Sequence, residues 1–153
     1  MLRRVARDPS VFFQRRPSLR AARSSSLSTQ PPPKKRLGFY GLGTMGSHIA
    51  THMHKHSVAA GQGPALVASR TASKARALAD ERGLEYRADF AALARDCDVL
   101  ALCLSTTADV ETVLTDAIDA LRRGALIIDV TSGDPDATAA LGDALAASHG
   151  VRL

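Results

Sequence analysis

The feature that most constrains the fold is a glycine turn at residues 41–46, which read Gly-Leu-Gly-Thr-Met-Gly. This G-x-G-x-x-G turn directly follows the apolar segment 37–40 and precedes a stretch with helical spacing of apolar residues. In that context Gly41 permits a tight turn, Gly43 lets the backbone approach a pyrophosphate, and Gly46 lets the helix pack against the strand. The free N–H groups at the helix start then face phosphates. We expect a strand–turn–helix unit that binds a dinucleotide, with a glycine turn that holds no ligand as the alternative.

The rest of the chain from residue 37 alternates short apolar runs with amphipathic stretches, which is typical of βαβ units. Strands are predicted near 37–41, 65–69, 98–104 and 125–130, with a weaker one at 84–87. The run 98–104 is almost continuously apolar, as in a strand covered by helices on both faces, and 125–130 reads the same way. The predicted fold class is therefore α/β, a Rossmann-type, doubly wound parallel sheet in three layers (αβα) and one domain over 37–153.

Each predicted helix has a start or stop signal. The helix after the glycine turn is expected to bury Met45, Ile49 and Met53 on one side. A second helix is expected to begin at a cap, Thr71 or Ser73, and to end at Gly83, and a short third one to follow the cap Asp89 and to carry Phe90 and Leu93. A fourth is expected over 107–122, with Gly124 as its terminator. The last is expected to have Asp134 as N-cap and Pro135 as its first residue, and to end at Gly150.

The end of the second predicted strand indicates which dinucleotide is bound. NAD sites usually carry an acid there that accepts from the ribose hydroxyls, whereas this segment reads Val67-Ala-Ser-Arg-Thr71 and has none. Arg70 can instead form charge-assisted hydrogen bonds to a 2′-phosphate, with Ser69, Thr71 and Lys74 assisting. We therefore predict NADP as the cofactor. The alternative is that Arg70 is a solvated surface charge. The missing acid also disfavours a methyltransferase.

Three separated segments together resemble the β-hydroxyacid dehydrogenase family, which includes 3-hydroxyisobutyrate dehydrogenase, and the related NADP-binding domain of 6-phosphogluconate dehydrogenase. They are LGFYGLGTMG, ASRTASKARAL, and VLALCLS with IIDVTSGDP. The resemblance implies an oxidoreductase that transfers hydride between NADP and a small hydroxyacid. It also implies that the backbone of Leu104 and Ser105 lies beside the nicotinamide ribose, and that Thr131 and Ser132 line the edge where substrate meets nicotinamide. The chain departs from the family pattern at Ser69, Ser105 and the order Thr131-Ser132.

The predicted site therefore combines the glycine turn, the end of the second strand and the ends of the two later strands. The predicted cofactor-binding residues are Gly41, Leu42, Gly43, Thr44, Met45, Gly46, Ser69, Arg70, Thr71, Lys74, Leu104, Ser105 and Thr131, and the predicted substrate residues are Thr131 and Ser132.

No catalytic residue is predicted. The resembling family continues into a substrate motif and an all-helical domain with a catalytic lysine, whereas Lys34, Lys35, Lys55 and Lys74 match no such position. We expect a sequence truncated before that helical domain and not catalytic alone. The alternative is a non-catalytic NADP-binding interaction module. A transcript extending beyond Leu153 would favour the enzyme. Substrate identity and oligomeric state are not predicted.

Residues 1–36 are expected to be a disordered mitochondrial presequence with a Pro- and Lys-rich linker, which places the protein in the mitochondrial matrix. They hold ten of the twenty Lys and Arg residues and one acid, Asp8. The alternative is a basic tail that stays in the cytosol. The remaining residues carry ten bases and fourteen acids, so nucleic-acid binding is not expected. No apolar run approaches the length of a membrane span, so no membrane partner is expected.

Two further patterns involve histidine and cysteine residues. His48, His52 and His56 share a helical face that could hold zinc, but the sequence offers no H-E-x-x-H glutamate and no fourth ligand nearby, so helix surface is preferred and no metal is predicted. Cys97 and Cys103 are expected to be reduced thiols in or near the core.

Overall fold

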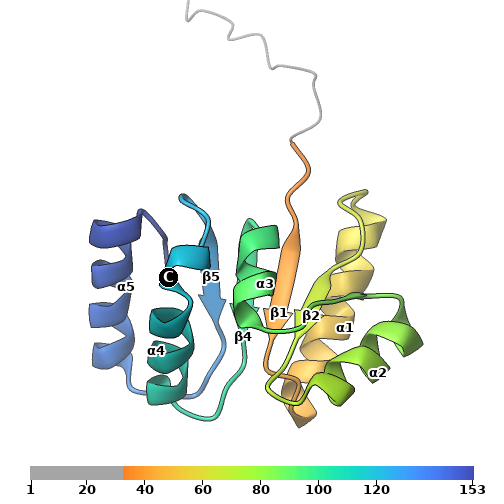
Figure 1. Ribbon diagram of the computed structural model, residues 1–153, viewed down its shortest axis with the longest axis horizontal. Helices are drawn as coiled ribbons and strands as arrows, with labels where there is room; N and C mark the ends of the chain where they lie inside the picture. Colours follow the sequence, from red (N-terminus) through yellow and green to blue (C-terminus); the bar gives the residue numbers. More distant parts are fainter. Residues whose placement is uncertain (1–32) are drawn as a thin grey trace, which may run out of the picture. The chain divides into compact units, whose positions relative to one another are not determined.

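The computed structural model describes residues 33–153, so residues 1–32 of the predicted presequence and linker lie outside the described part. Five parallel strands form one sheet in the order β3-β2-β1-β4-β5, which places the opening strand in the middle (Figure 1). This order confirms the predicted Rossmann-type sheet. The elements are β1 (Leu37–Tyr40), α1 (Thr44–Ala59), β2 (Leu66–Ala68), α2 (Ala72–Arg82), β3 (Glu85–Tyr86), α3 (Phe90–Asp96), β4 (Val99–Leu102), α4 (Thr107–Asp116), the 3₁₀ turn η2 (Ile118–Ala120), β5 (Leu126–Asp129) and α5 (Pro135–His149).

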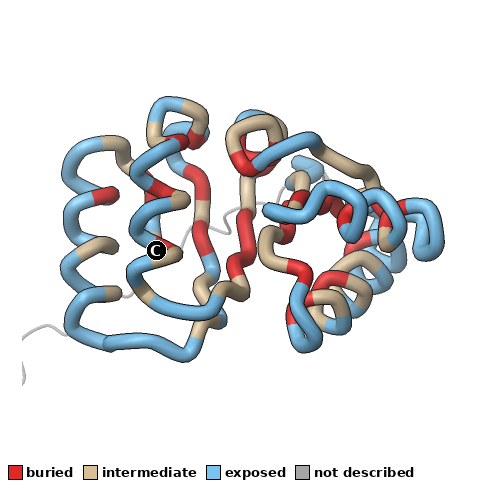
Figure 2. Tube along the Cα trace, turned by 60° about the horizontal axis from the view of Figure 1, so that its bottom comes forward, coloured by how far each residue is buried: buried red, intermediate tan, exposed pale blue. Residues whose placement is uncertain are grey.

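Alternating side chains of the strands supply two separate cores, one on each face of the sheet. Leu66, Leu100 and Leu102 pack with α3, α4 and α5, whereas Phe39 and Val67 pack with α1 and α2. Because β-strand residues point alternately to opposite faces, this division gives three layers, as predicted. Figure 2 shows buried residues concentrated along the strands and on the inner sides of the helices.

The prediction that β5 is covered on both faces is wrong. Ile127 is buried against α4 and α5, but Ile128 is 40% exposed and Val130 is 43% exposed on the other face. The two described helices on that face, α1 and α2, pack over β1, β2 and β4, so neither covers β5. Beyond α5, Arg152 forms a parallel bridge with Leu126.

Two helix predictions also need correction. Met45 is 66% exposed, although Ile49 and Met53 do pack against the core as expected. Met45 lies in the first turn of α1, directly after the end of β1, and its side chain lines an open groove instead of the core. The predicted helix 107–122 ends at Asp116 and continues as the short 3₁₀ turn, and Gly124, with φ +81°, instead makes the turn before β5.

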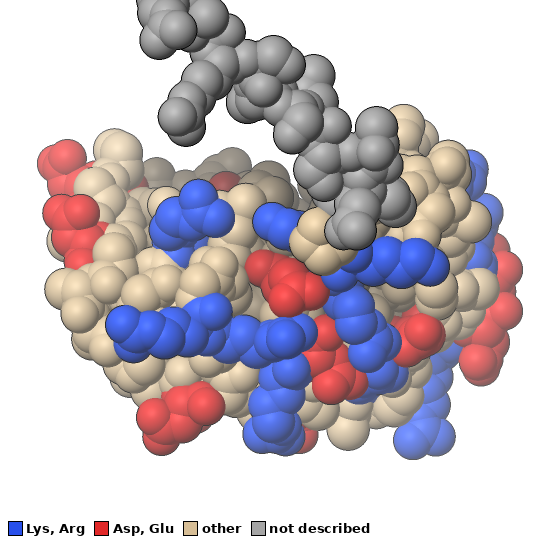
Figure 3. Space-filling model, turned by 90° about the horizontal axis from the view of Figure 1, so that it is seen from above, with Lys and Arg blue, Asp and Glu red and all other residues tan. Residues whose placement is uncertain are grey.

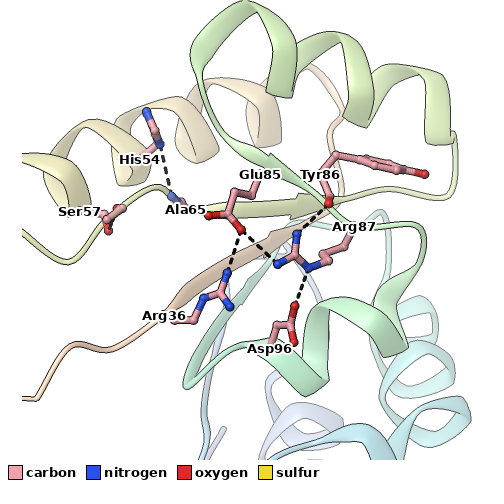
Figure 4. A network of polar contacts seen from close by, with 9 residues as sticks. Arg36, His54, Ser57, Ala65, Glu85, Tyr86, Arg87 and Asp96 are labelled. Atoms are coloured by element: carbon pink, nitrogen blue, oxygen red, sulfur yellow. Dashed lines mark hydrogen bonds and ion pairs between the residues drawn. The ribbon is translucent and has the colours of Figure 1, made fainter.

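The start of the described chain is held by a network of ion pairs where the strands begin (Figure 4). The Arg36 guanidinium lies 2.8 Å from Glu85, which also pairs with Arg87, and Arg87 in turn donates to Asp96 at 2.6 Å. The backbone N–H of Arg36 donates to Asp98 at 2.9 Å. Arg36, assigned from the sequence to the linker, is thus joined to the sheet. Figure 3 shows basic and acidic side chains intermixed on this face. Among residues 33–153, no helix has the length and apolar character needed to cross a membrane.

Candidate functional site

A groove of about 630 Å³ lies at the carboxyl ends of the strands, across the end of β1. The β1–α1 turn and the loops after β2, β4 and β5 line it. Chain connections from β1 lead to β2 on one side, and β4 lies on the other, so the groove sits where the strand order reverses. This position is where open α/β sheets bind ligands.

Two of the three glycines in the turn are required by the protein's own packing. Gly41 has φ +99°, a conformation that L side chains rarely adopt, and a Cβ there would overlap the carbonyl oxygen of Cys103. A Cβ on Gly46 would overlap the carbonyl oxygen of Gly41 and approach the Phe39 ring at 3.3 Å. Both positions therefore have the local roles predicted for them.

Gly43 is different, because nothing lies within 4 Å of the place where its Cβ would be. It caps α1 in extended backbone, with φ −73° and ψ −170°, and no side chain closes this helix start. Backbone N–H groups of the first helical turn therefore face the open groove. The protein itself gives no reason for a glycine here, whereas a phosphate approaching the backbone would need the space.

The β2 end of the groove is basic and polar. Ser69, Arg70, Thr71 and Lys74 all line it, as the sequence predicted. Arg70 and Lys74 are exposed and form no ion pair with another described residue, which leaves both cations available to an anion. Ser69 Oγ accepts a long hydrogen bond of 3.4 Å from the Thr71 N–H, which shapes the loop into α2.

Tyr40 also lines this part of the groove and was not predicted. As the last residue of β1 it pairs in register with Ala68, the last residue of β2, and the loop that carries Arg70 follows directly. Its ring meets Phe90 edge-on, with ring centroids 5.1 Å apart. Burial raises the pKa of Tyr40, the Arg70 charge opposes that rise, and Asp89 adds to it. The only sequence signal for Tyr40 was its place just before the glycines.

At the other end of the groove, Leu104 and Ser105 after β4 face Val130 and Ser132 after β5. Thr131 does not line this groove but a neighbouring hollow beside α5, and its Oγ1 accepts the Leu104 N–H at 3.0 Å. The structure thus brings together all of the predicted binding residues except Thr131. The groove also has lining residues that the sequence analysis missed. They are Tyr40, Ile49, Cys103, Asp109, Val113 and Val130.

The two cysteines differ in accessibility. Cys97 is fully buried, and desolvation raises the pKa of its thiol to about 12. Cys103 is partly exposed in the groove. Within residues 33–153, no three His, Cys, Asp or Glu side chains converge as metal ligands. His48, His52 and His56 are exposed on α1, in line with the interpretation as helix surface.

Comparisons with known proteins agree with this geometry. Residues 36–153 match the family described as the NAD binding domain of 6-phosphogluconate dehydrogenase. An uncharacterized oxidoreductase of Bacillus subtilis is 31% identical over 105 residues, which cover 67% of this chain and 34% of that protein. An NADPH-dependent reductive aminase of Aspergillus oryzae is 30% identical over 118 residues, covering 77% of this chain and 37% of the aminase.

Among solved structures, 3-hydroxyisobutyrate dehydrogenase of Mycobacterium tuberculosis superposes with a TM-score of 0.66 at 25% identity, covering 77% of this chain and 38% of the dehydrogenase. The chain spans about a third of the length of the two curated relatives.

Proposed function

Since the chain belongs to the family of the NAD-binding domain of 6-phosphogluconate dehydrogenase, we propose that its groove binds NADP, with the 2′-phosphate at Arg70. The observation that carries this proposal is that one groove holds both the open backbone at Gly43 and, on its adjoining wall, two cations, Arg70 and Lys74, that pair with no acid among residues 33–153. A pyrophosphate needs the first feature, and an additional phosphate needs the second.

The proposal includes a direction for the dinucleotide in the groove. The adenosine half, which carries the 2′-phosphate, lies toward β2 with Arg70 and Lys74, and the pyrophosphate rests on the first turn of α1. The nicotinamide half then extends to the loops after β4 and β5, between Ser105 and Ser132. When bound, the cofactor would donate hydride from its nicotinamide ring as NADPH or accept it as NADP⁺, so a substrate would have to be met at this end.

For the longer protein of which such a domain is part, we propose an oxidoreductase that transfers hydride between NADP and a small organic substrate, with a hydroxyacid as the first class to test. The named relatives include both a dehydrogenase of a hydroxyacid and a reductive aminase. The domain's share of that reaction is to bind and orient the cofactor.

Calorimetric titration of the full chain with NADPH and with NADH tests the cofactor proposal. Wild type is expected to prefer NADPH. Arg70→Ala should weaken NADPH binding by about 10- to 150-fold, since one charge-assisted hydrogen bond contributes about 1.5–3 kcal/mol, and should leave NADH binding nearly unchanged. Arg95→Ala is the matched control, because Arg95 is an exposed arginine on α3 outside the groove. Equal affinity of wild type for the two cofactors would refute the role of Arg70.

We also propose that residues 1–36 direct import into the mitochondrial matrix. The support is the composition of this segment, with ten basic residues and one acid. A fluorescent protein fused behind residues 1–36 should enter mitochondria, and a fusion with its seven arginines before Lys34 changed to Ala should stay in the cytosol. Cytosolic fluorescence of the first fusion would overturn this proposal.

A further inference from the structure

The two loops that form the far end of the groove are tied to each other by threonine side chains. The backbone ladder between β4 and β5 ends where the Val130 N–H donates to the Leu102 carbonyl at 2.9 Å. Beyond that point the Leu104 N–H donates to Thr131 Oγ1 at 3.0 Å, and the Asp134 N–H donates to Thr107 Oγ1 at 2.8 Å. Thr131, in the loop after β5, and Thr107, the first residue of α4 after the β4 loop, thus each accept a backbone N–H from the other segment.

Neighbouring residues fit this reciprocal arrangement. Asp129 Oδ1 accepts the Thr131 N–H at 2.8 Å, which fixes the backbone that presents the Thr131 hydroxyl. Gly133 leaves room for Thr107, because a Cβ on Gly133 would overlap Thr107 Oγ1. Gly133 is not in a left-handed conformation, so a glycine is needed here to leave space for Thr107 and not for its backbone angles. The reciprocal pair is therefore built into the local packing of both loops.

We propose that Thr131 and Thr107 are positioning residues that hold these loops at the spacing required by the nicotinamide half of the cofactor. This inference rests on the proposed NADP site. Of the residues that line the groove there, Ser105 on one loop and Ser132 on the other each lie one position from a tied residue, Leu104 or Thr131. A ligand seated between two loops binds more tightly when their spacing is fixed beforehand, because less conformational freedom is lost on binding.

This role replaces direct contact as the function of Thr131. Its hydroxyl oxygen accepts the Leu104 N–H, and its side chain lines the neighbouring hollow instead of the groove. The adenosine half of the groove, formed by the β1–α1 turn and the loop after β2, has no part in this tie. The two halves of the ligand should therefore respond differently when the tie is removed.

Calorimetric titration with NADPH and with 2′,5′-ADP, which carries the adenosine and its 2′-phosphate but no nicotinamide, tests the inference on the full chain. Thr131→Val should weaken NADPH binding by about two- to tenfold, the range expected for one neutral hydrogen bond, and change 2′,5′-ADP binding by less than about twofold. Thr131→Ser keeps the hydroxyl and should restore NADPH affinity. Thr107→Val and Gly133→Ala, which break the second contact, should reproduce the Thr131→Val pattern and serve if that variant folds poorly.

Thr112→Val is the matched control, because the Thr112 hydroxyl donates only to the Ala108 carbonyl of its own helix, at 2.8 Å. Equal weakening of both ligands would assign Thr131 a general structural role and overturn the inference. Unchanged NADPH affinity in Thr131→Val, or wild type that binds NADPH no more tightly than 2′,5′-ADP, would do the same. Wild type that binds neither ligand would refute the proposed function itself.

Discussion

Substitution of two glycines in the same turn should separate cofactor binding from folding. In Gly43→Ala the new methyl group meets no protein atom within 4 Å, and φ −73° with ψ −170° is open to alanine. Reduced freedom of the unfolded chain favours the variant by about 0.4–1 kcal/mol. Loss of a glycine at the helix N-cap opposes this by roughly 0.5–1 kcal/mol. The free energy of unfolding should therefore change by less than about 1 kcal/mol.

Binding should respond quite differently in Gly43→Ala. The methyl group takes the space through which a phosphate reaches the N–H groups of the first turn of α1, so at least one charge-assisted hydrogen bond is lost. Such a bond contributes about 1.5–3 kcal/mol, and the Kd for NADPH should rise by at least about tenfold.

Gly46→Ala is the contrasting variant. Its methyl group would overlap the Gly41 carbonyl oxygen, which is backbone and cannot rotate away. Overpacking of this kind costs about 1–3 kcal/mol. At about 4 °C per kcal/mol for a domain of this size, Tm should fall by roughly 4–12 °C.

Thermal unfolding by circular dichroism and calorimetric titration with NADPH measure the two quantities on the same samples. Gly43→Ala is expected to melt with wild type and bind poorly, and Gly46→Ala to melt early. Wild-type NADPH affinity in Gly43→Ala would show that the pyrophosphate does not rest on this turn. Wild-type stability in Gly46→Ala would refute the packing argument.

Three further predictions concern other parts of the domain. At pH 8 a thiol reagent should modify Cys103 quickly and Cys97 of the folded protein slowly, because Cys97 is buried and its raised pKa of about 12 keeps its thiol protonated. Bound NADPH should protect Cys103, which lines the groove, and rapid modification of both thiols would contradict the prediction. Asp134→Ala should lower the free energy of unfolding in urea by about 1 kcal/mol, because Asp134 accepts the N–H groups of Asp136 and Ala137 at the start of α5, and Asp134→Ser should recover most of it. The hydrogen bond and the charge of Arg87 lower the pKa of the Asp96 carboxyl, so the stabilisation by this pair is present above the pKa of Asp in the unfolded chain and is lost as the pH falls through the folded value. Asp96→Asn lacks this carboxyl, so its free energy of unfolding should fall less than that of wild type when the pH is lowered below about 4. The difference should be at most about 1 kcal/mol, because the pair is partly exposed.

Local sequence patterns were sufficient to predict the elements and their order. The strand before the glycine turn, the weak strand near 84–87 and the cap at Asp134 depend on residues close together in the chain, and all three are present. The need for glycine at Gly41 and Gly46 also follows largely from the turn between two adjacent elements, because a Cβ on Gly46 would meet Gly41 and Phe39, and Gly41 has φ +99°. The overlap of a Gly41 Cβ with the Cys103 carbonyl, however, involves a distant strand end.

Burial was harder to predict, because it depends on which elements cover a residue from elsewhere in the chain. Ile128 and Val130 continue an apolar run as regular as that of β4, yet no described helix lies over their face. Met45 follows the spacing of Ile49 and Met53 but lies past the carboxyl end of β1, where it lines the groove. Apolar periodicity identifies a face of an element, and only the packed neighbours determine whether that face is covered.

The two ends of the groove show the same distinction in function. At the β2 end the relevant side chains, Ser69, Arg70, Thr71 and Lys74, fall within six consecutive residues, so spacing alone was enough to bring them to one site. At the other end, Thr131 is 27 residues from the N–H that it accepts. A motif could indicate that this threonine matters, but it could not distinguish contact with a ligand from contact with Leu104. That choice depends on how two separate strand ends meet, so the β4–β5 end of the groove is where function has to be inferred from three-dimensional contacts.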